Sequence, residues 1–102
     1  MSERTAPSLA RFDELFPILN RLAPTGQDES ALSAHARLIE DAEALRRAIA
    51  AFHMEAIRFR MHNVDRALRE AGDDATVRGA FEQLRHALEA VGFHTRSHAA
   101  PT

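Results

Sequence analysis

The sequence predicts an all-α protein, and three observations support that prediction. The 102 residues are rich in alanine, leucine, arginine and glutamate, which are strong helix formers. Apolar residues recur at spacings of three and four, and no run alternates with the period of two that a half-buried strand needs. Four glycines and four prolines fall mainly at a few seams that divide the chain into three pieces. We therefore expect three helices, with one long central helix, in a bundle completed by homo-oligomerisation.

The first predicted helix runs from Ser8 to about Leu22, with Ser8 placed to cap its N-terminus. Its apolar residues share one helical face: Leu9, Phe12, Phe16, Leu19 and Leu22. Pro17 lies inside this pattern and removes one backbone donor, so a kink or a division into two short helices is expected there. Residues 23–27 then form a turn.

The central piece runs from about Asp28 to Ala71 and contains neither glycine nor proline. A continuous helix of this length would be roughly 66 Å long and would extend beyond a compact domain of this size. Asp28 is one of its candidate N-caps, and Gly72 is a natural stop. The alternative is a four-helix bundle in which this segment breaks near His62 and Asn63, with Asn63 as a left-handed C-cap.

The last predicted helix opens with Asp73 or Asp74 as its N-cap and ends at Gly92, followed by an apolar residue as in a Schellman motif. Its apolar face consists of Val77, Phe81, Leu84, Leu88 and Val91. The chain is expected to form a single helical domain over 1–102, in which 1–7 and 94–102 are loose tails. Phe52 and Phe81 are expected to be buried in its core.

The central piece carries two apolar stripes that do not coincide around a helix. One stripe contains Leu38, Ala42, Leu45, Ile49, Phe52, Ala56 and Phe59. The other contains Ala50, Ile57, Met61, Val64 and Leu68. Because the flanking helices can cover only part of this surface, the second stripe is the predicted interface with another copy of the chain.

Charge predicts how that copy is oriented. Residues 28–45 carry a net charge of −4, and residues 46–69 carry +4. An antiparallel copy would set each acidic half against a basic half, with a two-fold axis near Ala50. In that dimer Glu40 of one chain would approach Arg60 of the other.

Composition excludes several kinds of chemistry. The chain has no cysteine and no lysine, which removes thiol nucleophiles, thiolate metal sites, Schiff bases and the phosphate-loop lysine. It also lacks HExxH and the paired ExxH of di-iron bundles. The net charge of −2 argues against nucleic acid as a partner. The chain has neither a signal peptide nor an apolar run that could span a membrane, so we expect a cytoplasmic location. Because no catalytic motif is found, we expect no cofactor and assign no catalytic residue.

The expected function is that of a small helical protein-interaction module, such as an adaptor, chaperone or regulatory subunit, which acts as a homo-oligomer. Its partner is first of all another copy of itself. The alternative is a metal-binding helical bundle, because histidine and carboxylate side chains are common metal ligands. The candidate ligands for that alternative are His35, His53, Glu55 and His62.

Overall fold

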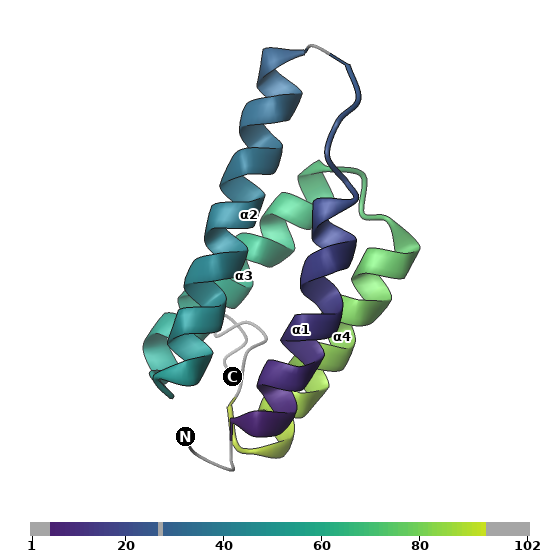
Figure 1. Ribbon diagram of the computed structural model, residues 1–102. Coiled ribbons are helices and arrows are strands. Elements are labelled where there is room, and N and C mark those ends of the chain that lie inside the picture. The colour runs from purple at the N-terminus through teal and green to yellow at the C-terminus, as the bar shows by residue number, and fades with distance from the viewer. Residues whose placement is uncertain (1–4, 27, 94–102) are drawn as a thin grey trace.

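The structure is a computed structural model that describes residues 5–26 and 28–93. In these residues it has no strand and four helices: α1 (Ala6–Asn20), α2 (Glu29–Ala50), α3 (Met54–Glu70) and α4 (Ala75–Ala90) (Figure 1). The prediction of an all-α protein is confirmed. The predicted count of three helices is wrong, because the central piece forms two helices, α2 and α3.

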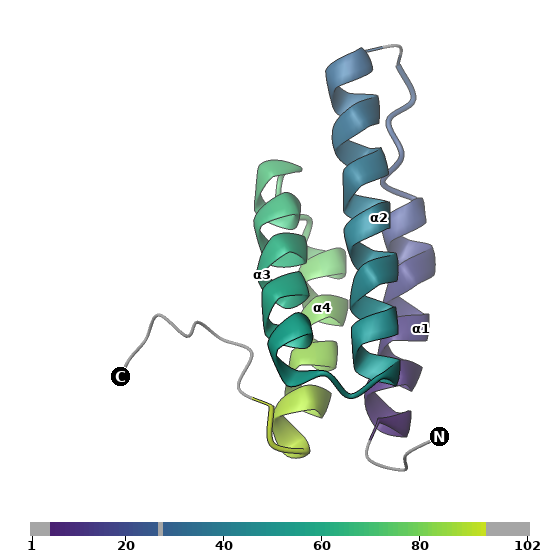
Figure 2. The same ribbon diagram turned by 90° about the vertical axis from the view of Figure 1, so that its left-hand side faces the viewer.

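The helices run up and down in turn and form two antiparallel pairs. α2 packs along α3, α1 packs along α4, and α1 also contacts α2. Figures 1 and 2 show the two pairs lying side by side. At 22 residues α2 is the longest helix, and its N-terminal turns extend beyond the ends of the others.

The central piece bends at residues 51–53, where Phe52 adopts a left-handed backbone conformation with φ of 57°. For a residue with a Cβ atom this conformation costs about 1–2 kcal/mol. The predicted alternative break near His62 and Asn63 is also wrong, since both residues lie inside α3.

The bend is held by the hydrogen bonds of a Schellman motif. The Phe52 N–H donates to the Ile49 carbonyl at 2.9 Å, and the His53 N–H donates to the Ala48 carbonyl at 3.1 Å. The same pair of bonds ends α3 at Gly72 and α4 at Gly92, where φ is 104° and 100°. The predicted Schellman ending at Gly92 is confirmed.

Side chains cap three of the helices at their N-termini. Asp28 accepts the N–H of Ser30 at 2.9 Å at the start of α2, and Asp74 accepts that of Thr76 at 2.9 Å at the start of α4. Both aspartates were among the predicted caps. At the start of α3 the Nδ1 atom of His53 accepts the N–H of Ala56 at 3.1 Å.

The start of α1 differs from the prediction. The helix begins at Ala6, with Thr5 before it, so Ser8 is a buried residue inside the helix and not its cap. The expected division at Pro17 is not found, and α1 continues through it to Asn20. Residues 6 and 7 of the predicted N-terminal tail thus belong to α1, while 1–4 and 94–102 lie outside the described residues.

The core consists of apolar side chains from all four helices and of Phe93, which lies three residues after α4. Its fully buried large members are Phe12, Leu15, Leu19, Leu45, Ile49, Ile57, Met61, Val64, Leu68, Phe81, Leu84 and Leu88. The predicted burial of Phe81 is confirmed. Phe52 is only partly buried, and its ring meets Phe93 edge-on, with centroids 4.9 Å apart.

Within one chain, α2 and α3 already pair in antiparallel directions, as the three-residue connection between them requires. An Arg60 nitrogen lies 3.5 Å from a carboxylate oxygen of Asp41 in this pairing. The antiparallel dimer, in which Glu40 of one chain would approach Arg60 of the other, stays a prediction.

Candidate functional site

The outward face of α3 carries large apolar side chains that the fold of one chain leaves exposed. Residues three or four positions apart lie on one side of a helix, and Glu55, Arg58, Phe59 and His62 have this spacing. Together they line a surface hollow of about 350 Å³. Two of the predicted metal ligands, Glu55 and His62, are thus brought to the same surface, beside an aromatic ring.

Phe59 is the most exposed large apolar side chain among the described residues, at 57%. Met54, on the first turn of the same helix, is 50% exposed. The guanidinium carbon of Arg60 lies 5.2 Å from the centre of the Phe59 ring, which is a cation–π distance. Phenylalanine, methionine and arginine are all enriched at protein interfaces relative to the rest of the surface.

Sequence reasoning missed this surface because it placed Phe59 on a buried stripe. That stripe assumed one continuous helix, and the bend at Phe52 makes α3 a separate helix with its own buried face. At about 100° per residue, Phe59 lies some 200° around α3 from the fully buried Ile57. Locating the bend is therefore the step that would have revealed Phe59 as exposed.

Arg58 forms part of the same hollow and is half-buried. Its Nε atom is buried and makes no hydrogen bond to any described residue. A buried donor without a partner is costly, since it has lost its hydrogen bonds to water. The Arg58 side chain is thus held at the edge of the hollow by packing, and no carboxylate in the described part of the chain accepts a hydrogen bond from its Nε atom.

The other two predicted metal ligands lie elsewhere. His53 uses Nδ1 to cap α3. The Nε2 atom of His35 lies 3.0 Å from the Leu19 carbonyl oxygen, which can only accept, so this nitrogen carries the hydrogen and donates it. Within residues 5–26 and 28–93, no three histidine, aspartate or glutamate side chains come close enough together to hold a metal ion.

The predicted interface stripe is used mainly inside the chain. Ile57, Met61, Val64 and Leu68 are at most 2% exposed and form the face of α3 that meets the core. Ala50, at the end of α2, is exposed. In the folded monomer, then, four of these five residues are already covered.

A second cavity, of about 390 Å³, lies at the end of the bundle between the N-terminal half of α2 and the C-terminal half of α3. Small side chains leave this space, among them Ala31, Ala34 and Ala67. His35 and Asn63 line it as well. The apolar and charged groups around it are mixed, and they single out no particular ligand.

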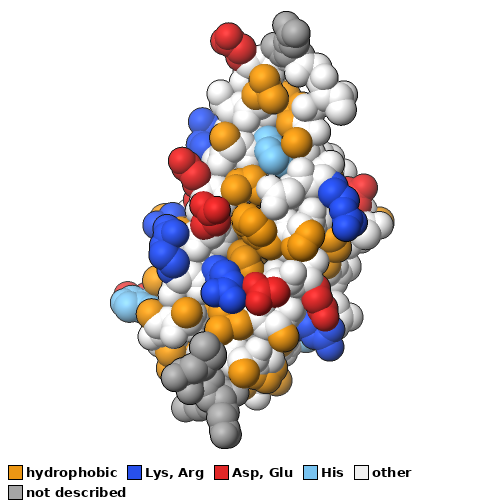
Figure 3. Space-filling model, in the orientation of Figure 1, with side chains coloured by type: hydrophobic (Ala, Val, Ile, Leu, Met, Phe, Trp, Pro, Cys, Tyr) orange, Lys and Arg blue, Asp and Glu red, His pale blue; other side chains and the backbone are white. Residues whose placement is uncertain are grey.

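The face formed by α1 and α2 also carries apolar side chains. Figure 3 shows them along the seam between the two helices, bordered by charged groups. Arg46 of α2 spans this seam and donates two hydrogen bonds to the Asp13 carboxylate of α1, at 3.0 and 3.2 Å. These hydrogen bonds lower the pKa of Asp13, against the opposing effect of its slight burial.

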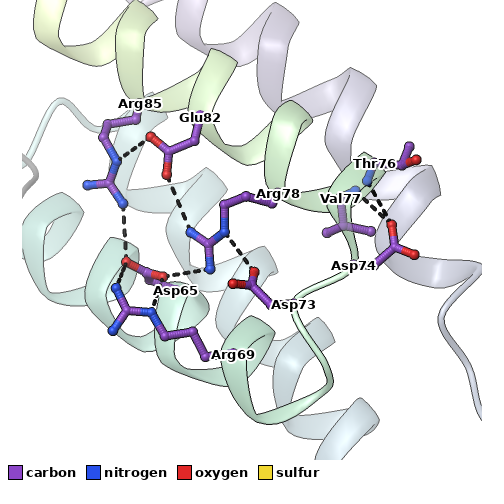
Figure 4. Close-up of polar contacts among 9 residues, drawn as sticks. All are labelled: Asp65, Arg69, Asp73, Asp74, Thr76, Val77, Arg78, Glu82 and Arg85. Atoms are coloured by element: carbon purple, nitrogen blue, oxygen red, sulfur yellow. Dashed lines mark hydrogen bonds and ion pairs between the residues drawn. The ribbon is translucent and has the colours of Figure 1, made fainter.

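A partly buried ion network joins α3 to α4 (Figure 4). The Asp65 carboxylate of α3 lies 2.9 Å from Arg78 and 3.3 Å from Arg85, both on α4. Glu82 contacts the same two arginines, at 3.3 and 3.0 Å. The Arg85 side chain is only 5% exposed, so its charge depends on these partners.

Arg78 and Arg85 each contact an aromatic ring as well as carboxylates. Their guanidinium carbons lie 5.4 Å (Arg78) and 5.2 Å (Arg85) from the centre of the Phe81 ring. Burial alone would lower the pKa of Arg78, but its contacts with the carboxylates of Asp73 and Asp65 outweigh that effect, so the pKa is raised. The contact with Asp65 at 2.9 Å is an ion pair without hydrogen-bond alignment. The network connects α3 to α4, and within it the charges of Arg78 and Arg85 are balanced by those of Asp65 and Glu82.

Comparisons with known proteins give no relative from which a function could be carried over. No family model, curated protein or solved structure matches the chain. Among the described residues, no helix combines the length and the apolar character needed to cross a membrane.

Proposed function

We propose that the chain is a small helical protein-interaction module that acts as a homo-oligomer, and that the outward face of α3 is its self-association surface. The observation that carries the proposal is the exposed Phe59 ring, on a helix whose other large apolar face is fully buried. Burial of that ring by a second copy would remove apolar area from water, which is the main favourable term in protein association.

The polar side chains on either side of Phe59 favour a second copy in the antiparallel direction. Glu55 lies one turn before Phe59, and His62 lies one turn after it. In an antiparallel pair of α3 helices centred on Phe59, Glu55 of each chain would face His62 of the other. Such a pairing is isologous, since the same surface is used twice, and isologous dimers are the commonest oligomers.

A pair of matched variants tests this proposal. Phe59→Ser removes the exposed ring, whereas Leu32→Ser removes an apolar side chain on α2 that is 44% exposed. By analytical ultracentrifugation over a concentration series, Phe59→Ser should raise the dimer dissociation constant by at least about tenfold, or about 1.4 kcal/mol. Leu32→Ser should leave it within about threefold.

Charge reversal tests the direction of the pairing. Glu55→Arg should weaken the dimer, and adding His62→Glu in the same chain should restore it, because the new arginine of each chain would then face a carboxylate of the other. A wild-type protein that remains a monomer at all concentrations would contradict the proposal. Equal effects of Phe59→Ser and Leu32→Ser would contradict the assignment of the surface.

The alternative function, a metal-binding bundle, has no comparable observation in its favour. Only Glu55 and His62 of its four candidate ligands share a surface, and His35 and His53 are engaged with the backbone elsewhere. Metal analysis of protein purified without a histidine tag tests this alternative directly.

A further inference from the structure

The connection between α2 and α3 has an unusual combination of properties. It is only three residues long, from Ala51 to His53, and it turns through a phenylalanine in a left-handed conformation. Positive φ at a bulky residue is a genuine outlier and usually requires support from the surrounding structure. Here the support is the packing of α3 and α4 against α2 and α1.

The local sequence favours a straight helix across this connection. Residues 28–71 contain neither glycine nor proline, and the bend is preceded by the alanines at 48, 50 and 51. Alanine has the highest helix propensity. Straightening the connection would relieve the conformation of Phe52 and join α2 to α3 with additional backbone hydrogen bonds, at the loss of the His53 cap and of the edge-on contact between Phe52 and Phe93.

A second copy could restore the contacts that straightening breaks. In the monomer, position 41 faces position 60, so the pairing of α2 with α3 is symmetric about the midpoint between residues 50 and 51. Two straightened chains that cross there in antiparallel directions would each offer α2 to the other's α3 and α1 to the other's α4. The exposed Ala50 and Ala51 at the crossing are small enough to let the two backbones approach.

We infer that residues 51–53 are a hinge through which two chains exchange their α3–α4 halves, giving an intertwined dimer with one continuous helix over 29–70. The partner is thus a second copy of this chain, and the contacts are those already present in the monomer. Short hinge loops under strain favour this kind of exchange. The inference goes beyond the proposed function, because it does not use the Phe59 surface.

Two substitutions of the same residue isolate the hinge. Phe52→Gly and Phe52→Ala both remove the ring and its contact with Phe93, but glycine adopts positive φ without strain, whereas alanine favours the helix. After refolding at high protein concentration, the dimeric fraction is measured by size exclusion with light scattering. The ratio of dimer to monomer should be at least about tenfold higher for Phe52→Ala than for Phe52→Gly.

Spin labels identify the dimer as the exchanged form. Because the chain has no cysteine, a cysteine at position 40 is the only labelling site. In the exchanged dimer the two labels should lie roughly 30 Å apart, on opposite sides of the crossing point. A wild-type dimer formed by the same refolding at high protein concentration should show the same distance, so the test does not depend on either variant.

The Phe59→Ser background distinguishes this dimer from the one described under the proposed function. An exchanged dimer should persist in Phe59→Ser and still respond to substitution of Phe52. Equal dimeric fractions for the two Phe52 variants, or a separation near 10–12 Å between the labels, about one helix diameter, would overturn the hinge. Loss of every dimer in Phe59→Ser would also overturn it, while leaving the proposed function intact.

Discussion

The two turns that flank α3 close with the same hydrogen bonds but are built from different residues. At the α3–α4 turn, Gly72 adopts φ of 104°, as a Schellman ending favours, and the next N–H, of Asp73, donates to the Leu68 carbonyl at 2.8 Å. At the α2–α3 turn, Phe52 occupies the position of the glycine at φ of 57°. The first turn is therefore specified locally, and the second depends on tertiary packing.

The helix pairs on either side of these turns differ in a similar way. α2 and α3 meet through apolar residues such as Leu45 and Met61, and both side chains are fully buried. α3 and α4 are connected by the ion network around Asp65. Because these charged contacts hold α3 and α4 together, we expect the two helices to move as one unit.

The largest expected effect concerns the ion network. Asp65→Ala would leave the nearly buried Arg85 without one of its carboxylate partners, and the loss should be about 3 kcal/mol, near the lower end of the range for a broken buried pair. The control is Arg69→Ala, which removes an exposed partner of the same carboxylate and should cost less than about 1 kcal/mol. Both are measured as the free energy of unfolding in urea. Similar losses for the two variants would show that the network is not a buried connection.

A smaller effect compares the two turns directly. Phe52→Gly should be more stable than Phe52→Ala by about 1 kcal/mol, because only glycine adopts the left-handed conformation without strain. Gly72→Ala should lose a similar amount, about 1 kcal/mol, since an added Cβ meets no atom within 4 Å and only the backbone is strained. These values come from thermal and urea unfolding of the monomeric fraction. A Phe52→Ala protein as stable as Phe52→Gly would mean that residue 52 is not held in this conformation.

The smallest expected effect concerns His53, the last residue of the α2–α3 turn. His53 caps α3 through Nδ1, and aspartate is a better capping residue. His53→Asp should therefore exceed His53→Ala in stability by about 0.5 kcal/mol, the lower end of the range for a capping residue, measured as the difference in unfolding free energy. No difference between the two would indicate that α3 needs no cap at this position, as in a helix that continues from α2.

Most of the fold could be predicted from the sequence where a local signal exists. Residue type placed Asp28 and Asp74 among the candidate caps and predicted the ending at Gly92, and the structure shows all three. The bend at Phe52 could not be predicted in this way, because alanine and phenylalanine give no indication of a turn. Only the packing of distant helices stabilises it.

The candidate surface could not be predicted either, because locating it depends on the same bend at Phe52. Glu55 and His62 were recognised from their residue types, but as candidate metal ligands, and Phe59 was placed on an apolar stripe shared with α2 residues such as Leu45. Once α3 is a separate helix, its buried face is fixed by Ile57, Met61 and Val64, and the remaining face with Phe59 is exposed. The ion network depends on the approach of α4 to α3, which no local pattern in the sequence indicates.

One distance measurement tests most directly whether the central piece bends at Phe52. Cysteines introduced at the exposed positions 36 and 66 carry two spin labels in one chain, and excess unlabelled protein suppresses distances between chains. The hairpin predicts a separation near the spacing of packed helices, roughly 10 Å between the helix axes plus the length of the labels. A single distance of about 45 Å in the monomeric protein, as in one unbroken helix, would contradict the account.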